Sequence, residues 1–207
     1  MTLTLILILV TSLISYQSFS NPAMFHKLSH RPSLEEEKRE FHRLLTAGFV
    51  HASWPHLLIN MFVLWQFGEV VELTYMRLFG EFPGRLAFIG LYLITIVAAN
   101  IPTFFMHRNN PGFSSVGASG AVSGIVFAFI LFDPWAMLGL FFFIPCPAIV
   151  AGLLFLGYSQ YASRKMDDRI DHVAHFYGAV FGFLYTVALK WQLLPFFAER
   201  VLEGLPL

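Results

Sequence analysis

The chain has 207 residues, of which 57% are hydrophobic and only 13% charged, and its 13 basic and 13 acidic side chains give a formal net charge of zero. The charged fraction is about half that of soluble domains, which excludes a water-soluble enzyme. The sequence has no basic stripe and no nucleic-acid-binding motif, which excludes a nucleic-acid partner. Charges gather between long uncharged runs, and this pattern indicates an all-α, polytopic membrane protein.

We expect one membrane domain over residues 1–207, with six transmembrane helices. The first is expected over about residues 2–20; it lacks a basic n-region and a small-x-small cleavage site, so we interpret it as a retained helix and not a signal peptide. A long loop over 21–52 follows, with a short charged helix and an apolar interfacial stretch. The other helices are expected over about 53–79, 85–106, 116–133, 147–163 and 171–190.

The segment between the fourth and fifth helices is apolar but short. Residues 135–144 cannot cross a membrane at this length, so we place them in the interface. Pro147 is expected in the first turn of the fifth helix, where its missing N–H is not needed. Cys146 is the single cysteine, which excludes an internal disulfide and favours a small packing residue. A short tail is expected after the sixth helix.

Polar side chains inside membrane helices are costly, so each is a candidate functional residue. His56 and Asn60 are four residues apart on one face of the second helix, Ser119 is near the start of the fourth and His175 near the start of the sixth. Even numbers of crossings separate these helices, so all three run in the same direction. Because a helix rises about 1.5 Å per residue, we expect His56, Ser119 and His175 at a similar depth.

Two pairs of glycines flank this serine and histidine. Gly120 and Gly124 form one GxxxG pair, and Gly178 and Gly182 form the other. Small residues at this spacing let helix backbones approach closely, and a Ser–His hydrogen bond between helices requires that approach. Taken alone, each glycine pair indicates close helix packing and not catalysis.

Three short motifs contain these residues: Gly117-Ala118-Ser119-Gly120, His56-Leu57-Leu58-Ile59-Asn60 and Ala174-His175-Phe176-Tyr177-Gly178. They resemble the three sequence signatures of the rhomboid intramembrane serine proteases, in order, spacing and helix placement. The resemblance covers about residues 42–183. It implies the basic six-helix bacterial form, in a bacterial inner (plasma) membrane, with the active site facing the extracytoplasmic side.

By this resemblance, Ser119 is the nucleophile and His175 the general base of a Ser–His dyad. The backbone N–H of Ser119 would hold the oxyanion together with His56 and Asn60, and Gly117 belongs to the same oxyanion and substrate region. The partners would be transmembrane segments of other membrane proteins, which must locally leave their helices to be cut, and the lipid bilayer. No metal or other cofactor is implied.

The chain also departs from the family pattern. Arg43 occupies the arginine of the family's Trp-Arg loop signature, and His51 matches a further histidine often seen before the oxyanion histidine. His42 replaces the tryptophan of that signature, and Ser123 stands where several relatives carry a tyrosine that packs against the base. These departures affect the anchoring of the loop and the orientation of the base, not the dyad itself.

Alternative interpretations remain open. Ser119 by itself is compatible with helix packing, and His175 with an interhelical hydrogen bond. A catalytically inactive rhomboid-like protein that binds transmembrane helices is the second hypothesis, although such proteins typically lack the serine or the histidine. Asp171 is either a triad acid or, as we favour, a carboxylate stabilised at a helix start.

Other intramembrane proteases and transporters fit less well. A metalloprotease would need an H-E-x-x-H helix, which the sequence lacks, and an aspartyl protease would need aspartates inside its helices. No internal repeat or ring of ion ligands favours a transporter or channel.

One observation opposes the expected orientation under the positive-inside rule. The loops on the active face contain nine of the 13 basic residues: Lys27, Arg31, Lys38, Arg39, Arg43, Arg108, Arg164, Lys165 and Arg169.

Overall fold

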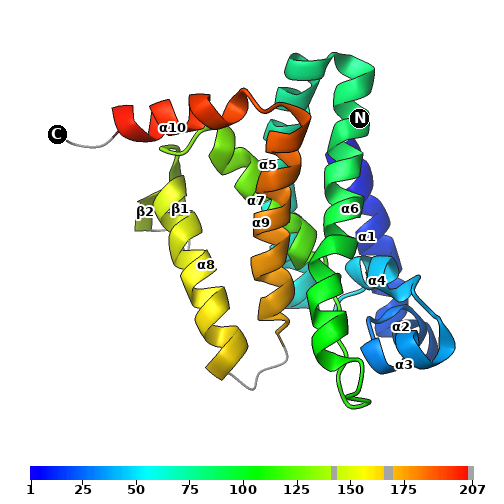
Figure 1. Cartoon of the computed structure of the whole chain (residues 1–207). Coiled ribbons are helices and arrows are strands. Elements are labelled where there is room, and N and C mark those ends of the chain that lie inside the picture. The colour runs from blue at the N-terminus through cyan, green and yellow to red at the C-terminus, as the bar shows by residue number, and fades with distance from the viewer. Residues whose placement is uncertain (141–143, 166–169, 205–207) are drawn as a thin grey trace.

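The fold is a bundle of long helices. The computed structural model describes residues 1–140, 144–165 and 170–204. Figure 1 shows the long helices side by side, with α10 lying across one end of the bundle. The helices of the bundle and α10 are α1 (Leu3–Phe19), α5 (Trp54–Phe79), α6 (Glu81–His107), α7 (Ser119–Phe132), α8 (Ala148–Lys165), α9 (His172–Leu189) and α10 (Leu193–Glu203).

Short elements connect these helices. The loop between α1 and α5 contains α2 (Pro22–Leu28), α3 (Pro32–Lys38), α4 (Arg43–Thr46) and the 3-10 turn η1 (Ala47–Phe49). Between α7 and α8, strands β1 (Met137–Leu140) and β2 (Ile144–Pro147) form an antiparallel hairpin in which Met137 pairs with Pro147. The all-α prediction is therefore correct for the bundle and misses one small hairpin.

Three of the described helices, α5, α6 and α9, are long and apolar enough to cross a membrane. The helices α1 and α7 are apolar but have only 17 and 14 residues. Fourteen residues rise about 21 Å, which is less than the hydrocarbon core of about 30 Å. A membrane-embedded helical fold is confirmed, and six complete crossings remain a prediction.

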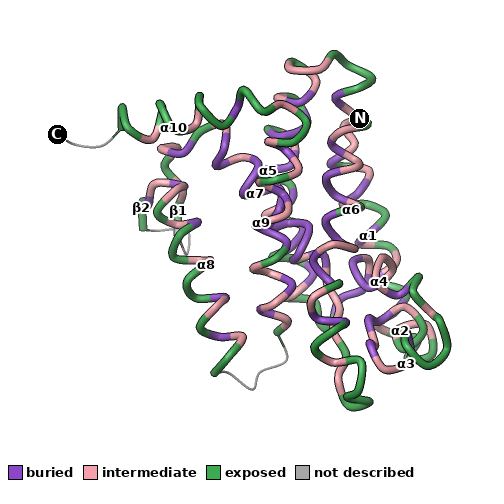
Figure 2. The backbone as a smooth tube through the Cα atoms, viewed as in Figure 1, coloured by how far each residue is buried: buried purple, intermediate pink, exposed green. Residues whose placement is uncertain are grey.

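The short helix α7 lies at the centre of the bundle and packs against α5, α6, α8 and α9 (Figures 1 and 2). Most of its residues are buried, including Ala121, Ile125 and Ala128. A side chain at Gly178 of α9 would overlap the backbone of Gly120. The close approach predicted from the glycine pairs is present, and it brings the starts of α7 and α9 together.

Local backbone chemistry sets where several helices begin. The Ser53 side chain accepts a hydrogen bond from the His56 N–H and caps α5. Asp171 caps α9 in the same way by accepting from the Ala174 N–H at 2.9 Å, which is the helix-start role favoured for it. The helix predicted from residue 116 starts at Ser119, because Gly117 has a φ of +123° that a helix cannot include.

Three expectations between and after the helices need correction. The stretch predicted as interfacial over 135–144 contains the β1–β2 hairpin, and its residues 141–143 lie outside the described part of the chain. Pro147 ends β2 and does not lie in the helix, because the first N–H groups of α8 donate back to Pro134 and Ala136. The expected short tail contains α10. Arg169 also lies outside the described residues.

A buried carboxylate attaches α1 to α5. Glu72, only 1% exposed, accepts hydrogen bonds from the backbone N–H groups of Leu3 and Thr4 at 2.8 and 2.9 Å and from the Thr4 hydroxyl at 2.8 Å. The first N–H groups of a helix have no partner within it, and a negative charge there is favoured by the helix dipole. This contact fixes α1 against the side of α5.

Candidate active site

The starts of α7 and α9 bring the predicted dyad together. Ser119 is the first residue of α7, and His175 lies in the first turn of α9. The Ser119 Oγ and the His175 Nε2 are 2.7 Å apart, which is hydrogen-bond distance. Both residues are half-buried, so neither is sealed away from a substrate. With Nε2 unprotonated, the serine hydroxyl donates to it, and this is the geometry needed to activate a serine.

An aromatic side chain of α8 supports the histidine. Phe155 stacks on the His175 ring with centroids 5.9 Å apart and an interplanar angle of 28°, and His172 contacts the same ring edge-on at 5.8 Å. Ser123 instead donates its hydroxyl to the Ser119 backbone carbonyl at 2.8 Å. The aromatic support expected from α7 in the family pattern is therefore provided from α8, and the sequence contained no signal for it.

The turn before Ser119 is shaped by Gly117. A Cβ at this position would lie 2.7 Å from Cε1 of His56, and the φ of +123° also favours glycine. The imidazole of His56 therefore packs directly against the peptide that leads into Ser119. This is the position that an oxyanion donor would need.

The same turn is anchored by two backbone N–H groups. Gly117 donates to the Ala47 carbonyl at 2.9 Å, and Ala118 donates to Nε2 of His51 at 3.3 Å. Because Nε2 of His51 accepts, the proton of the neutral ring lies on Nδ1, which is 2.9 Å from the Ser15 hydroxyl. Ser15 in turn donates to the Phe49 carbonyl at 2.9 Å.

His51 is fully buried in the loop before α5. Burial, together with the neighbouring His56, lowers the pKa of His51 to about 3. The imidazole therefore stays neutral, and only a neutral ring can accept the Ala118 N–H. Sequence reasoning noted His51 as a family position but did not identify this contact or the contribution of Ser15 from α1.

Asn60 lies one turn after His56 on α5 and is 5% exposed. Its amide donates to the backbone carbonyl of His56 at 2.9 Å. A carboxamide has two N–H donors, so this bond uses one of them. The structure thus places His56 against the turn before Ser119, and it places Asn60 beside His56.

A small cavity borders Ser119. Its volume is about 10 Å³, close to what one water molecule requires. The lining residues include Ser119, Gly120, Asn100 and Asp171. Within the described ranges, no three His, Cys, Asp or Glu side chains gather as metal ligands.

The Rhomboid domain model matches residues 38–192, about three quarters of the chain. The chain belongs to the rhomboid family. It is 32% identical over 171 residues to rhomboid-like protein 11, chloroplastic, of Arabidopsis thaliana, covering 75% of this chain and 54% of that protein. It is 30% identical over 146 residues to rhomboid protein 1, mitochondrial, of Saccharomyces cerevisiae, covering 69% of this chain and 40% of that protein.

This rhomboid chain spans about half the length of the curated relatives it matches. The names of these relatives place them in chloroplasts and mitochondria. The comparisons therefore support a membrane-embedded rhomboid protein and do not support the bacterial inner membrane expected from the resemblance.

Proposed function

We propose that this rhomboid protein is an intramembrane serine endopeptidase that cuts transmembrane segments of other membrane proteins. The observation that carries the proposal is the 2.7 Å contact between the Ser119 Oγ and the His175 Nε2. The two residues come from the starts of helices that pack through glycine, so their separation is set by backbone packing. A hydrogen-bonded, accessible pair of this kind is the minimal machinery for acyl transfer.

The reaction follows from these two groups. His175 takes the Ser119 proton on Nε2 as the Oγ attacks the scissile carbonyl carbon, giving a tetrahedral oxyanion. The same imidazolium then gives that proton to the leaving amine, and an acyl-enzyme remains. A water molecule, deprotonated by His175, attacks the ester; collapse of the second oxyanion releases the new carboxylate and returns the proton to Ser119.

The oxyanion would lie at the N-terminus of α7. We expect the Ser119 N–H, the helix dipole and the imidazole of His56 to stabilise it there, with Asn60 beside His56. The bond between Ala118 and His51 holds the peptide of this turn in one orientation. Loss of one oxyanion donor in better-known hydrolases lowers kcat by about 10²- to 10³-fold, which sets the scale expected for His56.

The substrate class follows from the location of the dyad. Helices α5 and α9 are long and apolar enough to cross a bilayer, and the dyad is formed by α7 and α9 within the same bundle, so it acts on chains that are themselves in the membrane. An intact transmembrane helix hides its carbonyls in backbone hydrogen bonds, so the segment must unwind locally before attack. We also propose six crossings, with α5, α7 and α9 parallel and the dyad open to one aqueous face.

The test is cleavage of a reporter transmembrane substrate by the protein reconstituted in liposomes. Ser119→Ala and His175→Ala should each lower the cleavage rate by at least about 10³-fold. Ser114→Ala is the matched control, since Ser114 is exposed in the loop before the nucleophile, and it should cleave at the wild-type rate. Undiminished cleavage by either dyad variant would refute the dyad. Binding of the reporter without cleavage by the wild type would favour the inactive rhomboid-like alternative.

A further inference from the structure

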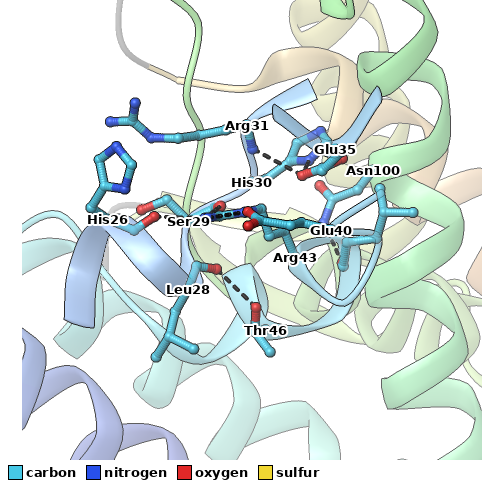
Figure 3. A network of polar contacts seen from close by, with 11 residues as sticks. His26, Leu28, Ser29, His30, Arg31, Glu35, Glu40, Arg43, Thr46 and Asn100 are labelled. Atoms are coloured by element: carbon cyan, nitrogen blue, oxygen red, sulfur yellow. Dashed lines mark hydrogen bonds and ion pairs between the residues drawn. The ribbon is translucent and has the colours of Figure 1, made fainter. Parts of the chain in front are cut away.

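A buried hydrogen bond between a histidine and a glutamate side chain lies in the loop between α1 and α5. His30 and Glu35 both have side chains that are 0% exposed, and the His30 Nδ1 lies 2.7 Å from the Glu35 Oε1 (Figure 3). The same carboxylate oxygen accepts the Arg31 backbone N–H at 2.9 Å. Removing a carboxylate from water is costly, and such pairs often contribute little net stability. Net stability alone therefore does not account for this pair.

The pair is not fully satisfied. The Nε2 of His30 and the Oε2 of Glu35 are both buried and, within the described ranges, neither has a hydrogen-bond partner. The large majority of buried side-chain polar atoms in proteins do have one. The hydrogen bonds of the Glu35 carboxyl group therefore go to the His30 ring and to the adjacent Arg31 backbone N–H.

That backbone is joined directly to the nucleophile loop. The His30 N–H donates to the Ser115 carbonyl at 3.0 Å, and the Ser115 N–H donates to the His30 carbonyl at 3.0 Å. The two residues form an isolated antiparallel bridge. Ser115 lies only four residues before Ser119, and Phe113 meets the His30 ring edge-on at 6.5 Å. A shift of His30 would therefore move the start of the turn that contains the nucleophile.

The other side of this segment is held by α4. Arg43 donates from Nη1 to the carbonyls of His26 and Ser29 at 2.6 and 3.1 Å, and Thr46 donates to the Leu28 carbonyl at 3.0 Å (Figure 3). With residues 26–29 fixed by these bonds, His30 is the residue through which this segment contacts the chain before Ser119. The hydrogen bond to Glu35 then fixes the position of the His30 side chain.

We propose that His30 and Glu35 are positioning residues for Ser119: their buried hydrogen bond fixes the backbone bridge to Ser115 and, through it, the turn that forms the oxyanion site. Both residues lie outside the 38–192 region that matches the family. The proposal rests on the proposed function, because positioning has a kinetic effect only if Ser119 is the nucleophile. The proposal gives a positioning role to a loop segment outside the residues that match the family.

The experiment measures kcat and KM for a reporter transmembrane substrate in liposomes, with kcat expressed per active site titrated by a fluorophosphonate. Glu35→Ala removes the acceptor and should lower kcat about tenfold with little change in KM, because small displacements of reacting groups are costly. Glu35→Gln keeps an acceptor oxygen and should restore most of the activity. Glu36→Ala is the control, since Glu36 is exposed on the same short helix, and its kcat should be unchanged.

His30→Leu provides an independent variant if Glu35→Ala does not fold. It keeps the backbone bridge to Ser115 but cannot donate to Glu35, and it should lower kcat by a similar factor. Loss of folded protein reduces the number of titrated sites and leaves kcat per site unchanged, so a purely structural role is distinguished. Equal kcat for Glu35→Ala and Glu36→Ala, or an effect on KM alone, would overturn the proposal. Cleavage that persists in Ser119→Ala would instead refute the proposed function.

Discussion

The Ala118 N–H donates to Nε2 of His51 at 3.3 Å, so the peptide immediately before Ser119 is held by an imidazole from the loop before α5. The Ser15 hydroxyl of α1 contacts Nδ1 of the same ring at 2.9 Å. Helix α1 and the loop it precedes thus share in orienting Ser119. The turn before Ser119 is therefore held by two segments that are far from it in the sequence, α1 and the loop before α5.

Removing this acceptor should slow the reaction without abolishing it. We expect His51→Ala to lower the cleavage rate about tenfold, because the buried Ala118 N–H would lose its partner, at a cost of about 1–3 kcal/mol. His42→Ala, an exposed histidine of the same loop, should cleave like the wild type. The measurement is the initial rate of reporter cleavage in liposomes, and equal rates for the two variants would contradict this role of His51.

The neutral state of His51 also predicts how stability changes with pH. In the folded protein its pKa is about 3, whereas in the unfolded chain a histidine takes a proton near pH 6.5. The unfolded state therefore binds more protons between these values, so this contribution to stability is complete above about pH 6.5 and falls as the pH decreases toward 3. One proton corresponds to about 1.4 kcal/mol per pH unit.

The check is thermal unfolding of wild type and His51→Ala between pH 7.5 and 5. The unfolding temperature of the wild type should fall more steeply with decreasing pH than that of the variant. Parallel curves for the two proteins would show that His51 is not the group responsible.

Phe155 should matter through the histidine it stacks on. Aromatic contacts of this type contribute about 0.5–1.5 kcal/mol, so Phe155→Ala is expected to reduce kcat by up to about tenfold. Leu154→Ala is the matched control, because Leu154 is 60% exposed on the same helix. The measurement is kcat for reporter cleavage by each of the two variants under steady-state conditions. If kcat is the same in both variants, the stacking does not orient His175.

The glycine contact between α7 and α9 offers a test of packing. A methyl group at Gly178 would overlap the backbone of Gly120, so Gly178→Ala should force the helices apart, lower the unfolding temperature and abolish cleavage. A methyl group at Gly157 of α8 would meet nothing within 4 Å. Gly157→Ala should therefore stay active and be more stable by about 0.5–1 kcal/mol, since alanine favours helix. Full activity of Gly178→Ala would contradict the close approach.

The sequence was sufficient to predict that Ser119 and His175 meet, because two simple constraints act on them. Parallel membrane helices place residues at equivalent helix starts at one depth, and glycine at every fourth position lets two helices touch. Ser119 and His175 satisfy both conditions and meet in the structure. These constraints depend on residue type and spacing alone, so they can be identified from a single sequence.

The residues that pack around Ser119 and His175 could not be predicted from the sequence, and the reasons are also physical. Phe155 is one of 24 phenylalanines in apolar helices, and nothing in the sequence distinguishes the ring that faces a histidine from those that face lipid. His30 and Glu35 lie in a loop whose path depends on the carbonyls that Arg43 binds. A short apolar run such as 135–144 is ambiguous between strand and helix, which explains the missed hairpin.

Reaction of the serine itself tests the central claim most directly. The purified protein in liposomes would be treated with a fluorophosphonate, and the modified residue and its rate of modification measured by mass spectrometry. We expect a single modification at Ser119, none in Ser119→Ala, and a rate at least about 10³-fold lower in His175→Ala, because the serine is a weak nucleophile without its base. An unmodified Ser119 in the wild type, or an undiminished rate in His175→Ala, would contradict a Ser–His dyad.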